Sequence, residues 1–410
     1  MITLKKDDFF SLAHGTCFYA SGGGGAITAA LKLIRQMPEN ASVTCVSLSE
    51  ALSDNKGLTA TVAFMGAPDA FKNPMYPPLD VIEAFKELDA KANTKYHKSI
   101  NYLIPIEIGA LSVAAIYMVA FEINKDRPEN EKIKIIDADG AGRAVPQLTL
   151  LTFASNGLSC NPSLLSRVIP NSSNNSSKRK ISQITAFTSS GSGINYNPVI
   201  TSKNENKYNV SIEIEDASQI ENMARIIISD PIYGEYAGLA LWIMTATELA
   251  KADPVTGYII KSLELGKKLR KAGKVTFTPL FHGKLKSIET ATSGGFDHGL
   301  ATFSSQDETF FIYIQNESLI GWTNSKSSPM VMAPDLICYL ADEFVIPEGC
   351  PEPIRVLSNA SDDWNAFKNK NITIYGLPCD KKLKTEKMSE AFYQLRMALG
   401  YPGVYIPIMD

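Results

Sequence analysis

The feature that most constrains the fold is a short apolar strand followed directly by a glycine-containing turn. Ile133–Ile136 is rich in β-branched residues, and Asp137–Arg143 then supplies two carboxylates, two glycines and an arginine. A β-branched run indicates a buried strand, and glycines after it indicate the loop at its carboxyl end. In open α/β sheets, ligands bind at that edge. We therefore expect Asp137, Asp139 and Arg143 to form a polar site, with an aspartate helix cap beside a surface ion pair as the alternative.

Secondary-structure patterns divide the chain into two parts. At 410 residues it is longer than one comfortable core, so two domains are expected. Strand and helix patterns alternate over residues 1–168, which predicts an α/β domain with a mainly parallel sheet. Residues 169–180 have the polar composition of a linker. Short strand patterns dominate residues 181–410 and predict a β-rich α+β second domain, with a helical insert formed by Ile220–Ser229, Tyr236–Ala250 and Val255–Lys271.

Composition excludes several classes of protein. The formal net charge of −3 and the charged content of 20% indicate an ordinary globular protein with no nucleic-acid partner. Residues 102–121 approach membrane-spanning length, but they contain Pro105 and Glu107, which favours a buried helix. The six cysteines form no CxxC pair, and residues 1–8 lack a signal-peptide pattern. We therefore expect reduced thiols, no membrane association and a cytoplasmic location.

A second glycine-rich segment precedes a predicted helix. Gly22, Gly23, Gly24 and Gly25 are followed by the helical pattern Ala26–Gln36. Glycine lets backbone N–H groups approach a ligand, and a helix N-terminus carries partial positive charge. The run therefore predicts a site for an anion, an enolate oxygen or a ring carbonyl, with a ligand-free tight turn as the alternative. It matches neither the dinucleotide fingerprint nor the P-loop, so no nucleotide is expected.

Further candidates lie outside these two segments. Glu107 begins an apolar helix, where the helix dipole favours an acid, or it shares a cleft with Asp137 and Asp139. Paired acids in one cleft push their pKa values apart, so that one acts as base and the other as acid. Asp297 and His298 lie in a predicted turn and are candidates for a divalent metal or for a base and its orienting partner. No HxH or HExxH spacing accompanies them, so the need for a cofactor stays open.

Several of these segments occur, in the same order, in one known family. The chain resembles the S-methyl-thiohydantoin desulfurase-like family, formerly an uncharacterised domain family that is often encoded beside hydantoinase and oxoprolinase subunits. The resemblance covers most of the chain and makes Asn316, Glu317 and Asp335 further substrate-binding candidates. The matching segments are Gly22–Gly25, residues 107–112, residues 137–148, residues 294–299, residues 315–317 and residues 334–337.

The chain departs from the family pattern at three positions. Relatives commonly carry an acidic residue directly after the glycines, where this chain has Ala26. They also tend to have two glycines and a polar asparagine after the glutamate, whereas Ala110 and Ser112 stand here after Glu107. These departures predict a reshaped pocket with a different substrate, and they keep a non-catalytic role open.

The resemblance implies a hydrolase that acts on a small thiohydantoin or hydantoin ring and requires no cofactor. For an S-methylated ring, water would add to the carbon that bears sulfur, and methanethiol would leave. Asp139 is then the expected base, tuned by Asp137 or Glu107, while Arg143 holds a ring oxygen or a carboxylate and the glycine amides stabilise negative charge. One alternative is a non-catalytic partner of a hydantoinase or oxoprolinase-like enzyme. A third is a metal-dependent hydrolase that uses Asp137, Asp139 and His298.

Overall fold

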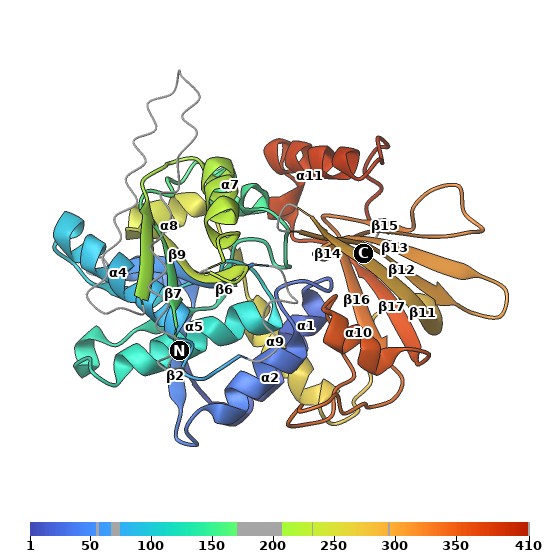
Figure 1. Ribbon diagram of the computed structural model, residues 1–410, viewed down its shortest axis with the longest axis horizontal. Helices are drawn as coiled ribbons and strands as arrows, with labels where there is room; N and C mark the ends of the chain where they lie inside the picture. The colour runs from blue at the N-terminus through green and yellow to red at the C-terminus, as the bar shows by residue number, and fades with distance from the viewer. Residues whose placement is uncertain (55–56, 67–73, 170–206, 232, 294–295, 409–410) are drawn as a thin grey trace.

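The computed structural model describes residues 1–54, 57–66, 74–169, 207–231, 233–293 and 296–408. Two β-sheets lie at opposite ends of the molecule, and helices α1 (Lys6–Tyr19), α2 (Ile27–Gln36) and α9 (Tyr258–Leu269) lie between them (Figure 1). The predicted linker, apart from Ile169, lies outside the described residues.

The first sheet has a parallel centre flanked by antiparallel strands. β2, β5, β4 and β3 run parallel, so their carboxyl ends meet at one edge. β1 pairs antiparallel with β2, and β9, β7 and β8 extend the other side in antiparallel fashion. The predicted α/β domain is confirmed, with a mixed sheet. The spatial order is β1 (Ile2–Lys5), β2 (Ser42–Val46), β5 (Lys134–Ile136), β4 (Ile100–Leu103), β3 (Leu58–Gly66), β9 (Tyr236–Met244), β7 (Ser163–Val168) and β8 (Lys207–Ile212).

Strand β9 corrects one prediction. We expected a helix over Tyr236–Ala250, but the strand occupies its first part and α8 (Ala246–Ala252) follows. The run from Ala237 to Met244 is buried because β9 is an inner strand, paired with β3 and β7 at its two edges, and because α4 (Leu79–Tyr96) and α8 pack against it. A continuous apolar run has no period that distinguishes a buried strand from a buried helix. β8 and β9 follow the predicted linker in the sequence, yet both strands belong to the first sheet.

Helices pack against the first sheet and against one another. α4 and α5 contact β3, and α8 contacts β3 and β9. The apolar segment after Glu107 forms α5 and is buried along most of its length, as predicted. No helix in the described ranges is long and apolar enough to cross a membrane. The remaining helices are α3 (Leu48–Ser53), α4 (Leu79–Tyr96), α5 (Ala110–Asn124), α6 (Thr152–Ser155), α7 (Ala217–Ile228), α10 (Ser361–Phe367) and α11 (Glu386–Ala398).

Two glycines let the backbones of α1 and α9 touch. A Cβ atom at Gly15 would lie 1.8 Å from the carbonyl oxygen of Ser262, and one at Gly266 would lie 1.7 Å from that of Ser11. Each contact is closer than real Cβ atoms allow, so a larger residue at either position requires the helices to separate. α1 also contacts α5 and β16, so this helix pair joins the two sheets.

The second sheet is antiparallel throughout and confirms the predicted β-rich part. Strands β14 and β15 at one end also contact β16 at the other, which curls the sheet towards a barrel. The order is β15 (Val331–Met332), β14 (Glu317–Thr323), β13 (Thr309–Gln315), β12 (Phe296–Ser304), β11 (Pro279–Ser293), β17 (Asn371–Leu377) and β16 (Leu336–Ala341). A separate short ladder pairs β6 (Ala138–Asp139) with β10 (Val255–Thr256).

Candidate active site

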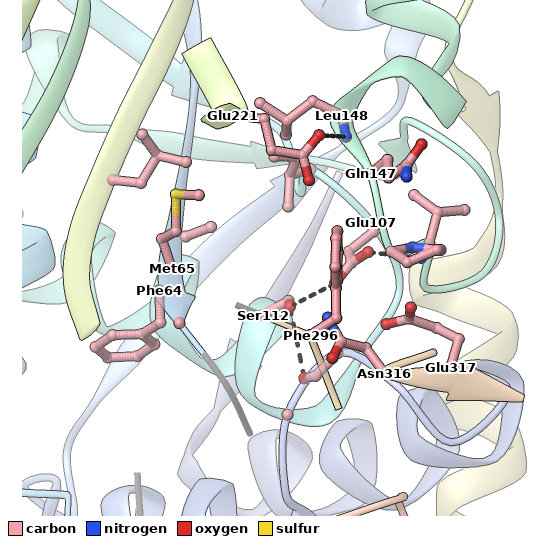
Figure 2. A pocket seen from close by; sticks show the side chains of 18 of the residues that line it. Phe64, Met65, Glu107, Ser112, Gln147, Leu148, Glu221, Phe296, Asn316 and Glu317 are labelled. Atoms are coloured by element: carbon pink, nitrogen blue, oxygen red, sulfur yellow. Dashed lines mark hydrogen bonds between the residues drawn. The ribbon is translucent and has the colours of Figure 1, made fainter. Parts of the chain in front are cut away.

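A cavity lies where the carboxyl ends of the parallel strands meet the turns of the second sheet. Its walls come from the end of β3, the loops after β4 and β6, helix α7, and the segment of Asn316 and Glu317. Its volume of about 160 Å³ is close to that of the cavity of roughly 150 Å³ that accommodates benzene. The space therefore suits a small ring. Figure 2 shows Glu107, Asn316 and Glu317 on one wall, with Phe64 and Met65 across from them.

Glu107 supplies a carboxylate that can exchange a proton near neutral pH. It lies between β4 and α5, where its Oε2 accepts a hydrogen bond from the backbone N–H of Val145 at 2.8 Å. Its Oε1 accepts one from the hydroxyl of Ser112 at 3.2 Å (Figure 2). Burial raises the pKa of Glu107 to about 7, although both hydrogen bonds and the charge of Arg143 act to lower it. A group with such a pKa is suited to general acid–base chemistry.

Glu317 places a second carboxyl group at the same cavity. It begins β14, is 3% exposed, and its Oε2 has no hydrogen-bond partner among the described residues. Burial, and then the charge of Glu107, raise the pKa of Glu317 well above its usual range, while Arg143 acts to lower it. Two buried carboxyl groups this close do not both ionise readily, so one holds a proton while the other is ionised. Such a pair carries both an acid and a base.

Asn316 fixes the tight turn from which Glu317 projects. Its backbone adopts a left-handed φ of 56°, which asparagine tolerates better than most residues. Its Oδ1 accepts a hydrogen bond from the backbone N–H of Asp297 at 2.8 Å, and its own N–H donates to the Asp297 carbonyl at 2.8 Å. The Asn359 side chain donates to the Asn316 carbonyl at 2.8 Å. Hydrogen bonds to Asp297 and Asn359 in the second part of the chain therefore fix the position of this part of the cavity wall.

The glycine run packs against protein groups at most of its positions. Gly24 and Gly25 line the cavity, and the Gly24 carbonyl accepts hydrogen bonds from the N–H groups of Leu111 and Ser112, which caps α5. A Cβ at Gly23 would lie 2.1 Å from Oε1 of Glu317, so glycine leaves room for that carboxyl group.

The N-terminus of α2, where we expected a ligand anion, is occupied by a carboxylate of the protein. Asp363 on α10 accepts hydrogen bonds from the N–H groups of Ile27 and Thr28 at 3.1 and 3.4 Å. The charge of Asp363 thereby satisfies the positive end of the helix.

Asp139 is completely buried and does not line the cavity. Its Oδ1 accepts hydrogen bonds from the N–H groups of Ala141 and Gly142, and its Oδ2 has no partner in the part of the chain that the structure describes. Burial raises the pKa of Asp139 to about 8, and the charges of Glu107 and Asp137 add to the increase. Asp139 is therefore near enough to Glu107 to influence it, but it lies behind the cavity wall.

Asp137 caps a helix. Its Oδ1 accepts hydrogen bonds from the N–H groups of Ile259 and Ile260 at 3.0 and 3.3 Å, in the first turn of α9. This is the helix-cap alternative raised from the sequence. The carboxylate does not line the cavity.

Arg143 joins the two parts of the chain, whereas the Asp335 side chain holds segments of the second part together. The Arg143 guanidinium is fully buried and donates hydrogen bonds to the carbonyls of Ala144, Ser318, Pro334 and Asp335. The Asp335 carboxylate accepts from the N–H groups of Cys379 and Ile408 at 2.9 and 2.7 Å. Neither side chain lines the cavity.

The metal candidates do not gather into a ligand set. Asp297 and His298 are consecutive residues of β12, so their side chains leave opposite faces of the sheet. Within the described ranges, no three His, Cys, Asp or Glu side chains cluster at metal-binding distances. Gly294 and Gly295, which belong to the same motif, lie outside those ranges.

Sequence reasoning missed the wall formed by α7. Glu221 and Arg225 line the cavity, and Arg225 lies over the ring of Phe296, which lines it too. The available signal was a Glu–Arg pair four residues apart on a helical pattern. Such pairs are usually solvated surface features, so the pattern alone gave no reason to choose them.

The fold and the cavity define a two-domain protein that joins an α/β sheet to a curled antiparallel sheet, with paired acids at their junction. Models of the S-Me-THD-like N-terminal and C-terminal domains match residues 7–173 and 215–394. The chain therefore belongs to the S-methyl-thiohydantoin desulfurase-like family, as the resemblance predicted.

A solved structure is similar over the whole length of the chain. It is the crystal structure of a structural-genomics target protein from Chromobacterium violaceum, with a TM-score of 0.75 and 26% sequence identity. The alignment covers 100% of both chains. A search of curated proteins gives no match.

Proposed function

We propose that this protein is a hydrolase that removes the sulfur substituent from a small S-methylated thiohydantoin-type ring. The observation that carries the proposal is the pair of carboxyl groups, Glu107 and Glu317, at one ring-sized cavity. Family membership supplies the substrate class. A small heterocycle and acid–base chemistry suit this arrangement, in which no residue needs to form a covalent intermediate.

The two acids have complementary tasks in this reaction. Glu107, when ionised, takes a proton from water as the water oxygen bonds to the ring carbon that bears sulfur, and it passes this proton to the adjacent ring nitrogen, which receives the electron pair of the C=N bond. The carbon–sulfur bond then breaks as the carbonyl forms, and Glu107 takes the proton of the new hydroxyl group. Glu317 gives its proton to the departing sulfur, and Glu107 returns a proton to Glu317. The overall change converts the S-methylated ring and water into a ring carbonyl and methanethiol. Each proton transfer contributes about 10²–10⁴-fold.

Asp137, Asp139 and Arg143, which we expected to act in catalysis, have supporting roles in this proposal. Asp139 interacts electrostatically with Glu107, and Asp137 caps α9. The charge of Arg143, which lies behind the cavity wall, acts to lower the pKa values of both glutamates. We therefore assign the role of base to Glu107 rather than to Asp139, because Glu107 lines the cavity.

The test is release of methanethiol from an S-methyl-thiohydantoin. We expect release by the wild type and a loss of about 10²-fold or more in kcat for Glu107→Gln and for Glu317→Gln. Glu129→Gln, at an exposed site, is the matched control and should retain full activity. Circular dichroism and thermal unfolding establish that each variant is folded.

Two outcomes would count against the hydrolase. If the wild type releases no thiol but the ring compound raises its melting temperature, the cavity is a binding site. That result would favour the alternative of an accessory partner of a hydantoinase or oxoprolinase-like enzyme. If release persists in Glu107→Gln, the assignment of the base is wrong.

A further inference from the structure

A continuous set of contacts joins α7 to the carboxylate of Glu107. Arg225 lies over the ring of Phe296 with its guanidinium 3.7 Å from the ring centroid, and it donates a hydrogen bond to Oε1 of Glu221 at 2.6 Å. The second oxygen of Glu221 accepts a hydrogen bond from the backbone N–H of Leu148 at 3.2 Å (Figure 2). These contacts hold Glu221 in one orientation, with one oxygen on the arginine and the other on the loop.

The loop held by Glu221 is the one that holds Glu107. Residues 145–148 line the cavity, and the backbone N–H of Val145 donates to Oε2 of Glu107 at 2.8 Å. Pro146 stiffens this segment because its ring fixes φ. One short segment is therefore attached at each end to a glutamate, Glu107 on the side of the first sheet and Glu221 on α7.

We propose that Glu221 is a positioning residue that, through residues 145–148, holds the Glu107 carboxylate in its reactive orientation. Glu221 is 8% exposed, and its pairing with Arg225 compensates for the loss of hydration that burial imposes. The inference rests on the proposed function for its catalytic meaning, while the structural link itself can be measured without substrate.

Loss of the link and loss of charge have opposite effects on Glu107. The hydrogen bond from Val145 favours the ionised form, so breaking it raises the pKa of Glu107. Removing a nearby negative charge lowers the pKa instead. The other groups around Glu107 are Glu317, Asp139, Arg143 and the Ser112 hydroxyl, and the Glu221 variants leave all four in place. The direction of the shift therefore identifies which effect operates.

The experiment is a titration of the side-chain carboxyl of Glu107 by ¹³C NMR, with the signal assigned through its absence in Glu107→Gln. We expect Glu221→Leu, which cannot accept from Leu148, to raise the pKa by about half a unit to one unit, the size of one lost hydrogen bond. Glu221→Gln keeps an acceptor oxygen and should restore a pKa at or below the wild-type value. An unchanged or lowered pKa in a folded Glu221→Leu variant would overturn the inference.

Kinetics separates this inference from the proposed function. If the wild type releases thiol, Glu221→Leu should lower kcat about tenfold with little change in KM, and move the acidic limb of its pH profile to higher pH. Glu221→Gln should recover most of the lost kcat. If the wild type releases no thiol but the NMR shift occurs, the positioning link stands and the proposed reaction falls. Thiol release with an unshifted Glu107 signal gives the reverse conclusion.

Discussion

Burial sets the protonation of the individual carboxyl groups around the cavity. The pKa of Glu107 is raised to about 7 and that of Asp139 to about 8, and that of Glu317 is raised well above its usual range. The cause is the same at each residue, because loss of hydration disfavours the charged form. What differs is the compensation. Glu107 accepts two hydrogen bonds to separate oxygens, whereas Glu317 leaves one oxygen without a partner in the described residues.

The free energy of unfolding should change with pH because Asp139 titrates differently in the folded and unfolded states. The carboxyl titrates near 3.9 when unfolded but near 8 when folded, so the folded state binds the proton more tightly. Its contribution to stability is present below about pH 4 and is lost as the pH rises to 8, by up to about 1.4 kcal/mol per pH unit. Asp139→Asn should therefore lose less free energy of unfolding between pH 5 and pH 8 than the wild type in urea titrations. Identical pH slopes in the two proteins would contradict this assignment.

Single residues also mark where sequence reasoning reaches its limit. The strand, the turn and the place of Glu107 at the carboxyl edge of the sheet could be predicted from residues 107 and 133–143, because local patterns report strands and turns. The tasks of Asp137 and Arg143 could not. Each side chain acts on backbone groups that are distant in sequence, Asp137 on residue 259 and Arg143 on residue 335. Nothing local distinguishes a carboxylate that caps a helix from one that faces a ligand.

Among the elements, the pair formed by α1 and α9 fixes the spacing between the two sheets. Gly15 and Gly266 place backbone directly on backbone, so neither helix can accept even a methyl group at its contact. Secondary structure of this kind was largely predictable where apolar residues recur at helical spacing, as in α2, or where the apolar run is long enough for a helix, as in α5. β9 was mistaken for a helix because both of its faces are buried in the packed sheet, which removes the alternation that a half-exposed strand shows.

A methyl group at this crossing should destabilise the protein strongly. Gly15→Ala and Gly266→Ala each force a helix to shift, although alanine is the better helix former, and we expect a loss of at least about 1–3 kcal/mol. Glu264→Ala, exposed on α9, is the control and should lie within about 0.5 kcal/mol of the wild type. Urea unfolding followed by circular dichroism measures the difference. Stabilisation by either glycine substitution would mean that the helices are not in contact.

For the molecule as a whole, a buried arginine connects the two sheets. Arg143 reaches from the loop after β6 to the carbonyl of Ser318 in β14 and to those of Pro334 and Asp335 in the loop between β15 and β16. The two-domain class followed from the change of pattern along the sequence. The junction did not, because its contacts, such as Asp363 with Ile27, join residues 336 positions apart.

Removing this connection should weaken the whole fold. Arg143→Met leaves several buried carbonyls without a donor and Glu317 without its nearby cation, and we expect a loss of about 3–5 kcal/mol. Arg143→Lys keeps the charge but has fewer hydrogen-bond donors, so its free energy of unfolding should lie between those of the wild type and Arg143→Met. The comparison is with Arg355→Met, whose guanidinium donates to Ala341 within the second half of the chain. Equal urea midpoints for Arg143→Met and Arg355→Met would rule out a special role for the junction.

The reach of Asp363 to the start of α2 has a consequence for how the protein is made. Gly24 and Glu107 leave the ribosome early, Glu317 follows some two hundred residues later, and the carboxylate that satisfies α2 emerges later still. A nascent chain therefore cannot complete the cavity until Glu317 has been synthesised. Until Asp363 follows, the start of α2 has no carboxylate to accept hydrogen bonds from its N–H groups.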